Sequence, residues 1–263
     1  MPGETDSKHD IQEIVGESRA LKQLLAQTAR VAASNATALI LGEAGSGKEL
    51  IASAIHRMSP RRKNSFVKVN CSISPESLER TLFGHAMGAL TGVPLKVGKL
   101  ELANQGTLFL DEIAELSLDL QPKLLGVLQN QKFERLGSMR TQQTDVRLIA
   151  ATKHDLETRV AAHQFCSDLY DLLKPFPIRV PSLRERYTDI PLLVRYFVQK
   201  FSGRMGKHIE TIPTETMNAL LNWSWPGNVR ELENLVEQSV ILTEGPTLRV
   251  LITGWPPSER EPR

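Results

Sequence analysis

The sequence predicts an α/β fold, a parallel sheet covered by helices on both faces, followed by a small all-helical domain. Two observations support this prediction. Between residues 38 and 152, short apolar runs typical of buried strands alternate with amphipathic helical segments. Beyond Asp189, three helical stretches follow with no strand between them. A chain of 263 residues is long enough for one large and one small domain.

Composition and charge are those of an ordinary soluble globular protein. Hydrophobic residues make up 41%, charged residues 24%, and the net charge is +2, so no surface that coats nucleic acid is expected. Cys71 and Cys166 form no C-x-x-C motif, which fits a reducing compartment and argues against a disulfide framework or a zinc site. No apolar run could span a bilayer and residues 1–10 do not resemble a signal peptide, so we expect a cytoplasmic protein with no membrane partner.

The apolar run Ala38–Leu41 is predicted to be a strand, and a helix is predicted to include Leu50–Ile55. Between them lie Gly42, Glu43, Ala44, Gly45, Ser46, Gly47, Lys48 and Glu49. Glycines let backbone N–H groups face an anion, the helix N-terminus adds partial positive charge, and Lys48 can reach the β- and γ-phosphates of a nucleotide. This pattern is a P-loop, with Glu49 where the general motif has a Mg²⁺-binding Ser or Thr. The alternative is a glycine-rich turn with no ligand, but the strand before and the helix after favour the P-loop.

A second apolar run, Thr107–Leu110, ends in the acids Asp111 and Glu112. In P-loop enzymes such a strand lies beside the P-loop strand, so its C-terminal acids reach the phosphates. We expect Asp111 to hold Mg²⁺, directly or through water, and Glu112 to orient the attacking water. Two adjacent acids at a strand end can also simply cap a helix. The P-loop upstream favours the catalytic interpretation.

The remaining elements are predicted from periodicity and from turn residues. They are a helix starting at Ser18, a strand at Phe66–Asn70, helices at Ser77–Phe83 and Leu118–Gln131, a strand at 146–152, and helices at 190–205, 214–223 and 228–243. Pro175, Pro177 and Pro181 interrupt the pattern between the two parts. We therefore divide the chain into a disordered stub at 1–12, a nucleotide-binding domain at 13–182, a helical lid at 183–250 and a tail at 251–263. Residues 84–94 are expected to form an apolar loop, which would need a partner surface to cover it.

Several motifs together carry a family resemblance. They are residues 42–49, 88–93, 107–113, Phe133-Glu134-Arg135-Leu136-Gly137, Leu183-Arg184-Glu185-Arg186, and Trp225-Pro226-Gly227-Asn228-Val229-Arg230-Glu231-Leu232. In this order they resemble the AAA+ domain of bacterial enhancer-binding proteins that activate sigma-54 RNA polymerase, and in particular the formate-hydrogenlyase activator subgroup. The resemblance runs from about Ile14 to about Val250, and it implies a P-loop AAA+ three-layer α/β/α domain with a helical lid.

The resemblance implies an ATPase that uses ATP and Mg²⁺, forms a ring that is usually a hexamer, and remodels the closed complex of the sigma-54 RNA polymerase holoenzyme. Glu49 is usual in this family. The segment that contacts sigma-54 corresponds to Gly88, Ala89, Leu90, Thr91, Gly92 and Val93. Asn70 matches a residue that couples the acid pair to this segment, Thr152 a sensor of the nucleotide, and Arg230 a sensor arginine in the lid. Arg135 falls on a second loop that supports the first.

The sequence departs from the family at functional positions. Leu90 replaces the aromatic residue of the sigma-54-contacting loop, Val93 replaces its final alanine, and Ala86 a glutamate. Cys166 and Leu172 stand where the family has two arginines that reach into the neighbouring subunit's active site. Such an arginine is worth about 10³ to 10⁵ in rate, or about 4 to 7 kcal/mol of barrier. Lys174 lies nearby but lacks the planar fork of arginine. Lys153 replaces a family asparagine.

Three functions remain open from the sequence. The first is a sigma-54 activator domain that hydrolyses ATP at subunit interfaces. The second is an ATP-binding, hydrolysis-deficient regulatory subunit of mixed rings, which the loss of arginine at positions 166 and 172 suggests. The third is an AAA+ remodelling ATPase that acts on another protein. No helix-turn-helix is visible, so DNA contact by this chain itself is not predicted.

Overall fold

The structure is a computed structural model that describes residues 14–86 and 96–250, and these form two compact units. The first unit comprises Ile14 and residues 20–181, and the second comprises residues 15–19 and 182–250. The sequence assigns all of residues 13–182 to the first domain, whereas residues 15–19 belong to the second unit. Asp189 explains this grouping, because its carboxylate accepts hydrogen bonds from the backbone N–H groups of Glu17 and Ser18, at 2.7 and 2.8 Å, and from the Ser18 hydroxyl at 2.7 Å.

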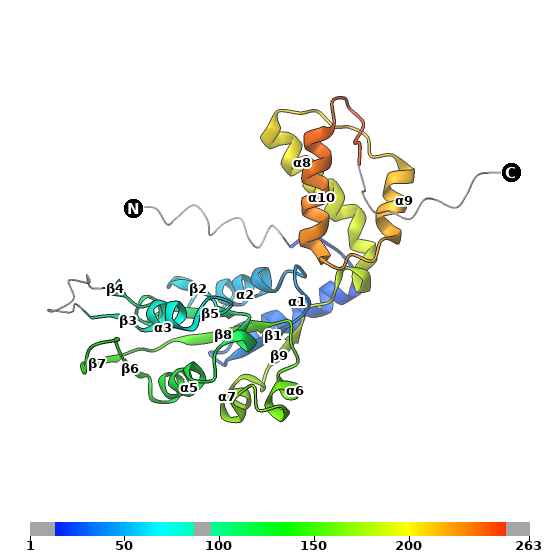
Figure 1. The fold of residues 1–263 in the computed structure, drawn as a ribbon. Helices are drawn as coiled ribbons and strands as arrows, with labels where there is room; N and C mark the ends of the chain where they lie inside the picture. The colour runs from blue at the N-terminus through cyan, green and yellow to red at the C-terminus, as the bar shows by residue number, and fades with distance from the viewer. Residues whose placement is uncertain (1–13, 87–95, 251–263) are drawn as a thin grey trace. The chain divides into compact units, whose positions relative to one another are not determined.

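The first unit is built on a five-stranded parallel sheet, which confirms the predicted fold class (Figure 1). The spatial order of the strands is β2 (Phe66–Asn70), β5 (Thr107–Asp111), β8 (Arg147–Thr152), β1 (Ala38–Leu41) and β9 (Pro177–Arg179). The P-loop strand β1 therefore lies next to β8, and β8 separates it from β5, which ends in the acid pair. All four neighbouring pairs are parallel, so their carboxyl ends meet at one edge.

Helices cover both faces of this sheet. Alternate strand residues point to opposite sides, and because these residues are apolar on both sides, each face packs against helices. On one side, Ile40, Phe109 and Ile149 pack against α1 (Arg19–Ala32) and α2 (Lys48–Arg57). On the other side, the core contains Leu39, Leu108, Leu110 and Leu148. Against it pack α3 (Pro75–Phe83), α4 (Lys99–Leu102), α5 (Leu120–Asn130), α6 (Leu156–Ala161), α7 (Ser167–Leu173) and the 3₁₀ turn η1 (Ile113–Glu115).

Edge strand β9 and two short hairpins are features that the sequence pattern did not predict. Proline suits the outermost strand because its missing N–H needs no ladder partner there, so Pro177 begins β9 instead of preventing a strand. The hairpins are β3 (Gly84–His85) with β4 (Lys96–Val97), and β6 (Lys132–Glu134) with β7 (Thr141–Gln143). Each is only two or three residues per strand, too short for the alternation of hydrophobic and polar residues to be visible.

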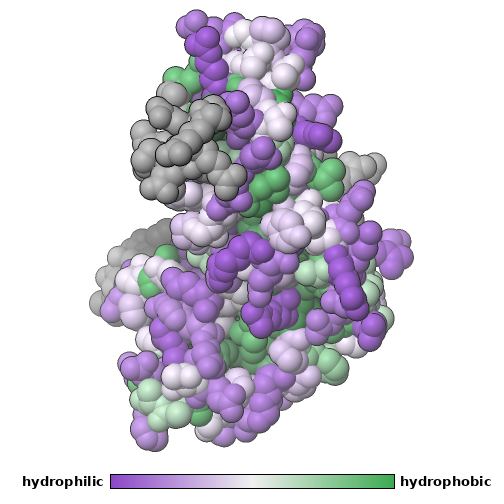
Figure 2. Space-filling view, turned by 90° about the vertical axis from the view of Figure 1, so that its right-hand side faces the viewer, coloured by the Kyte–Doolittle hydropathy of each residue, from purple (hydrophilic) through white to green (hydrophobic). Residues whose placement is uncertain are grey.

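The second unit is helical, as predicted. It contains the 3₁₀ segment η2 (Leu183–Asp189), α8 (Ile190–Met205), α9 (Thr214–Asn222) and α10 (Asn228–Leu242). Its own core includes Phe197, Phe201, Trp225, Leu232 and Val236. Among the described residues, no helix is long and apolar enough to cross a membrane. On the face drawn in Figure 2, hydrophilic residues predominate and hydrophobic residues show as patches between them.

Candidate functional site

The glycine-rich turn between β1 and α2 is fixed by its backbone. Gly42 N donates to Thr152 O at 3.2 Å, which ties the start of the turn to the end of β8. Gly45 and Gly47 have φ angles of 73° and 105°, values that side chains rarely permit. Gly47 immediately precedes α2, so the first N–H groups of a ten-residue helix face the space that the turn encloses. This geometry is suited to binding a phosphate.

The Lys48 side chain lies in this turn and is almost fully buried, with 7% of its surface exposed. Its ammonium donates to Gly42 O at 2.9 Å and to Glu43 O at 3.2 Å, and it lies 3.3 Å from Glu112 Oε1. An ammonium has three protons, so these three partners use its full capacity. Any phosphate that binds Lys48 must replace at least one of them.

The acid pair lies at the carboxyl edge of the sheet, beside this lysine. Asp111 ends β5 and is paired in register with Asn70 of β2 and Ala151 of β8. Glu112 follows with a left-handed backbone, φ 54° and ψ 52°, and its N–H donates to Asp111 Oδ1 at 3.1 Å. Its second carboxylate oxygen, Oε2, accepts a 3.2 Å hydrogen bond from the backbone N–H of Lys153. Both oxygens of Glu112 therefore have fixed partners.

Burial and mutual repulsion shape the electrostatics of these acids. Desolvation and the neighbouring charge of Glu112 raise the pKa of Asp111, and Lys48 offsets this only in part. Cys71 lies beside these acids, and its backbone N–H donates to Asp111 O at 2.9 Å. Desolvation and the charges of both acids raise the pKa of its buried thiol to about 12. Cys71 is therefore a thiol at neutral pH and is unsuited to act as a nucleophile.

The carboxylates suit a magnesium ion that arrives with a nucleotide. In the described ranges, no three histidine, cysteine or acidic side chains converge to form a complete metal cage. Mg²⁺ commonly binds one or two carboxylates together with substrate phosphates and water, so a full cage is not needed. Asp111 offers a hard oxygen ligand next to the glycine-rich turn. Its pKa is raised mainly by burial and also by the charge of Glu112, and a bound cation would oppose both effects.

The structure brings most of the predicted site residues to this edge, but not all of them. Thr152, fully buried at the end of β8, accepts a 3.0 Å hydrogen bond at Oγ1 from His154 N. Asn70 Oδ1 accepts from Ser72 N at 2.8 Å. Arg230 is exposed on α10, in the second unit. The predicted sigma-54-contacting segment, residues 88–93, lies outside the described residues.

Glu49 has a partner that the sequence pattern did not reveal. Its carboxylate pairs with the ammonium of Lys68 on β2, and about half of each side chain is exposed. The alternation along Phe66–Asn70 indicates only that Lys68 points to the opposite face of the strand from Val67 and Val69. Its ion pair with Glu49 joins a strand to a helix, and periodicity does not encode such a tertiary contact. The Glu49 carboxylate, at the start of α2, is consequently held toward β2.

A second cluster that sequence reasoning missed includes Glu115, which lies in the turn that follows the acid pair. His154 Nε2 lies 3.0 Å from Glu115 Oε1, and Arg159 Nη2 lies 3.5 Å from the same oxygen. Arg159 Nη1 also donates to Ala114 O at 2.7 Å. The turn η1 that follows Glu112 is thereby connected to the loop that follows Thr152. No signal in the sequence finds it, because its members lie on three different elements.

The loop between β6 and β7 is hydrogen-bonded to Gly84 and Ala86. Leu136 N donates to Gly84 O at 3.2 Å, and Ala86 N donates to Leu136 O at 2.9 Å. Arg135 is anchored by Glu101, with Nη2 and Nε at 2.5 and 3.1 Å from Oε2. The loop that contains Arg135 is therefore hydrogen-bonded, through Leu136, to Gly84 and Ala86.

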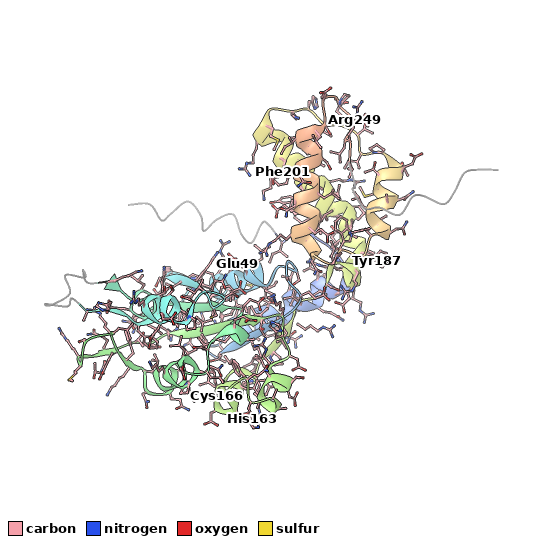
Figure 3. All side chains as sticks on the ribbon, in the orientation of Figure 1. Glu49, His163, Cys166, Tyr187, Phe201 and Arg249 are labelled. Carbon is pink, nitrogen blue, oxygen red and sulfur yellow. The ribbon has the colours of Figure 1, made fainter. Side chains whose placement is uncertain are left out.

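The positions that lack arginine lie on the opposite side of the sheet from α2. Figure 3 labels Glu49, at the start of α2, and Cys166, just before α7. Cys166 N donates to Gln121 Oε1 at 2.6 Å, and both Cys166 and Leu172 are partly buried against the core on that face. Lys174 is exposed and pairs with Asp171, with Nζ and Oδ1 2.6 Å apart.

Comparison with known proteins identifies a family for almost the whole chain. Residues 14–179 match the Sigma-54 interaction domain and residues 184–251 match the AAA+ ATPase lid domain. The formate hydrogenlyase transcriptional activator FhlA of Escherichia coli is 54% identical over 240 residues, which are 90% of this chain and 35% of FhlA. The transcriptional activator HyfR of the same organism is 52% identical over 91% of this chain and 36% of its own length.

A solved structure agrees with this match. NtrX of Brucella abortus, crystallised in complex with ATP, has a TM-score of 0.82 and 42% sequence identity, covering 88% of this chain and 50% of NtrX. The chain thus spans about a third of the length of the two curated relatives. On the combined evidence of sequence, sheet topology and glycine-rich turn, the chain belongs to the Sigma-54 interaction domain family and carries an AAA+ ATPase lid.

Proposed function

We propose that this chain binds ATP with Mg²⁺ and couples ATP hydrolysis to remodelling of the closed complex of sigma-54 RNA polymerase. It would do so in the cytoplasm, as one subunit of a ring, which in this family is usually a hexamer. The observation that carries the proposal is the convergence of Lys48, Asp111 and Glu112 at the carboxyl edge of the sheet. The ATP complex of NtrX and the activators FhlA and HyfR support it by similarity.

In this proposal each residue has a defined task. The turn from Gly42 to Glu49 and the Lys48 ammonium hold the β- and γ-phosphates. Asp111 would hold Mg²⁺, which adds positive charge at the phosphate oxygens. Glu112, released from Lys48 when the phosphate arrives, orients a water molecule whose oxygen bonds to the γ-phosphorus as the bond to the bridging oxygen breaks. The products are ADP and inorganic phosphate.

Three further residues are proposed to read or transmit the nucleotide state. Asn70 and Thr152 lie at the ends of β2 and β8, on either side of the acid pair's strand, and Arg230 belongs to the second unit as a lid sensor. We propose residues 88–93 as the surface that contacts sigma-54. The hydrogen bonds of Leu136 to Gly84 and Ala86, which precede these residues in the sequence, support a role for the β6–β7 loop in this contact. These assignments rest on the family match.

Binding is tested most simply with Lys48→Ala, measured by calorimetry with ATP and Mg²⁺. A charged contact to phosphate is worth about 1.5 to 3 kcal/mol, so loss of at least about tenfold in affinity is expected, and loss of detectable binding if the turn also opens. Lys132→Gln, an exposed lysine on β6, is the control and should bind like the wild type. Unchanged affinity in Lys48→Ala would contradict the proposed site.

A second function is favoured by one specific observation, the absence of arginine at positions 166 and 172. In that case the chain binds ATP but hydrolyses it very slowly, and acts as a regulatory subunit in mixed rings. Phosphate release by the wild type and by Cys166→Arg/Leu172→Arg separates the two functions. A rise of about a hundredfold or more supports the second function, whereas robust wild-type turnover that the arginines do not change supports the first.

Two controls sharpen this comparison. Ser167→Arg/Asp171→Arg places arginines at exposed positions directly adjacent to the two family positions, and should leave phosphate release at the wild-type rate. Because Leu172 is partly buried, thermal unfolding of the double variant must also match the wild type. Crosslinking to sigma-54 tests the output directly. Failure to crosslink in any nucleotide state would contradict the sigma-54 assignment and favour another protein target.

A further inference from the structure

Lys153 has a fixed backbone and an uncommitted side chain at the edge of the candidate site. Its N–H donates to Glu112 Oε2 at 3.2 Å. The following residue, His154, is held by its own N–H on Thr152 Oγ1 and by its ring beside Glu115. Asp155 then caps α6 by accepting from Glu157 N at 2.9 Å. The start of the Lys153 side chain is therefore placed by four consecutive residues.

Within the described part of the chain, the Lys153 ammonium has no acidic partner. Its side chain is exposed, and in residues 14–86 and 96–250 no carboxylate forms an ion pair with it. Lys48, by contrast, is surrounded by Glu112 and two backbone carbonyls. A positive charge is thus available beside two carboxylates without neutralising either of them.

The distances allow Lys153 to reach a phosphate held by Lys48. Lys153 N lies 3.2 Å from one oxygen of the Glu112 carboxylate, and Lys48 Nζ lies 3.3 Å from the other. With about 2.2 Å between the two oxygens, Lys153 N and Lys48 Nζ are at most about 9 Å apart. An extended lysine side chain spans about 6 Å, and a phosphate bound to Lys48 extends about 3 Å from it.

We propose that Lys153 is a phosphate-contacting residue, whose ammonium binds the terminal phosphate of a nucleoside triphosphate from within the same subunit. The inference deepens the proposed function and rests on it. Cys166 and Leu172 carry no charge, so neither can bind the terminal phosphate of a neighbouring subunit's nucleotide. In this proposal the Lys153 ammonium of the same chain binds that phosphate, and it would therefore favour a triphosphate over a diphosphate. As a point charge it binds the phosphate without the planar fork of arginine.

The alternative is that Lys153 is a solvated surface lysine, and nucleotide affinities separate the two interpretations. Lys153→Gln removes the charge at similar length. It keeps the backbone N–H, so the hydrogen bond to Glu112 is preserved. Calorimetry should show ATP affinity lowered about tenfold, with ADP affinity within about twofold of the wild type. Lys153→Arg retains the charge and should keep the preference for ATP, and Lys132→Gln should change neither affinity.

Each result has a defined meaning. Selective loss of ATP affinity in Lys153→Gln, rescued in Lys153→Arg, supports the inference. Equal affinities for ATP in the wild type and in Lys153→Gln, or a parallel loss of ATP and ADP affinity, overturn the role of Lys153 while leaving the proposed function intact. If the wild-type chain binds neither nucleotide, the proposed function fails and this inference fails with it.

Discussion

The Lys48 ammonium lies 3.3 Å from Glu112 Oε1, in an ion pair that is largely withdrawn from solvent. One partner belongs to the turn that is suited to phosphate, and the other is the acid proposed to orient water. In the proposed function, the γ-phosphate and Glu112 would compete for the same cation. The ion pair would then occupy Glu112 in the absence of nucleotide, and phosphate binding to Lys48 would release Glu112 for the attacking water.

We expect Glu112→Gln to bind ATP more tightly than the wild type and to hydrolyse it more slowly. The amide no longer holds Lys48 by charge and no longer repels the γ-phosphate, so affinity should rise several-fold. Loss of the carboxylate should lower phosphate release by about 10² to 10⁴ relative to an otherwise identical chain. Calorimetry and phosphate release under saturating ATP measure both effects, most clearly in the Cys166→Arg/Leu172→Arg background. Weaker ATP binding in Glu112→Gln would show that the ion pair does not compete with phosphate.

Asp111→Asn should stabilise the protein in the absence of ligand while it weakens Mg²⁺-dependent ATP binding. The pKa of Asp111 is raised by desolvation and by Glu112. As the pH rises through 3.8, the unfolded state loses its proton before the folded state, so the free energy of unfolding falls and the deficit persists at neutral pH. Asparagine has no such deficit. Urea unfolding at pH 7 tests the expected gain in stability, and ATP titration with and without Mg²⁺ tests the expected loss of Mg²⁺-dependent binding. A less stable Asp111→Asn chain would contradict the electrostatic argument.

The sequence predicts the parallel sheet well, and it predicts a glycine-rich turn and an acid pair at the ends of two strands, because these features depend on local patterns. Buried strands give unbroken apolar runs, and glycine-rich turns and strand-end acids have fixed places in a P-loop fold. Strand β9 was not predicted, since Pro177 is acceptable only at an edge, and whether a strand is at an edge is a property of the whole sheet. The short hairpins were likewise invisible to periodicity.

Interactions between distant elements could not be read from the chain. The Lys68 partner of Glu49, the Glu115 cluster and the Lys153 N–H on Glu112 each join different elements. Their partners are set by tertiary packing and not by spacing along the sequence. The same holds for residues 15–19, whose hydrogen bonds to Asp189 span more than 170 positions.

His56 should make the protein less stable as the pH falls below neutrality. Burial is the main cause of its lowered pKa, a hydrogen bond from the ring to the backbone of Asn64 opposes it, and Arg147 and Arg57 add repulsion. Between 6.5, the usual value, and the lower folded-state pKa, the unfolded chain binds more protons than the folded one. The free energy of unfolding therefore decreases as the pH falls through this window.

The comparison with His56→Gln isolates this effect. His56 Nδ1 lies 2.9 Å from Thr107 Oγ1, and its ring stacks on Phe66, so the variant is expected to be less stable at pH 7.5. Its stability should nevertheless change less than that of the wild type between pH 7.5 and 5.5. Other histidines, such as His154 beside Glu115, are common to both proteins and cancel in the difference. Parallel pH profiles would rule out His56 as the source.

Gly126 lies inside α5, beside a cavity of about 740 Å³ lined by Phe83, Phe133 and Leu136 among others. A Cβ atom built at Gly126 meets nothing within 4 Å. Glycine inside a helix costs about 0.5 to 1 kcal/mol relative to alanine, chiefly through the entropy of the unfolded chain, so Gly126→Ala should stabilise the protein by about that amount.

Gly106 provides the matched opposite case, which makes the Gly126 prediction a test of packing and not of glycine content. A Cβ at Gly106 would lie 2.3 Å from Ser65 O, a backbone atom of the segment that leads into β2. Both variants add only a methyl group, yet Gly106→Ala must displace the backbone at Ser65. The Ser65 carbonyl also accepts a hydrogen bond from the Thr107 N–H at 2.9 Å, which this displacement would disturb. Urea unfolding should therefore rank the proteins Gly126→Ala, wild type and Gly106→Ala in descending stability. A destabilised Gly126→Ala would mean that the cavity beside α5 is filled in solution.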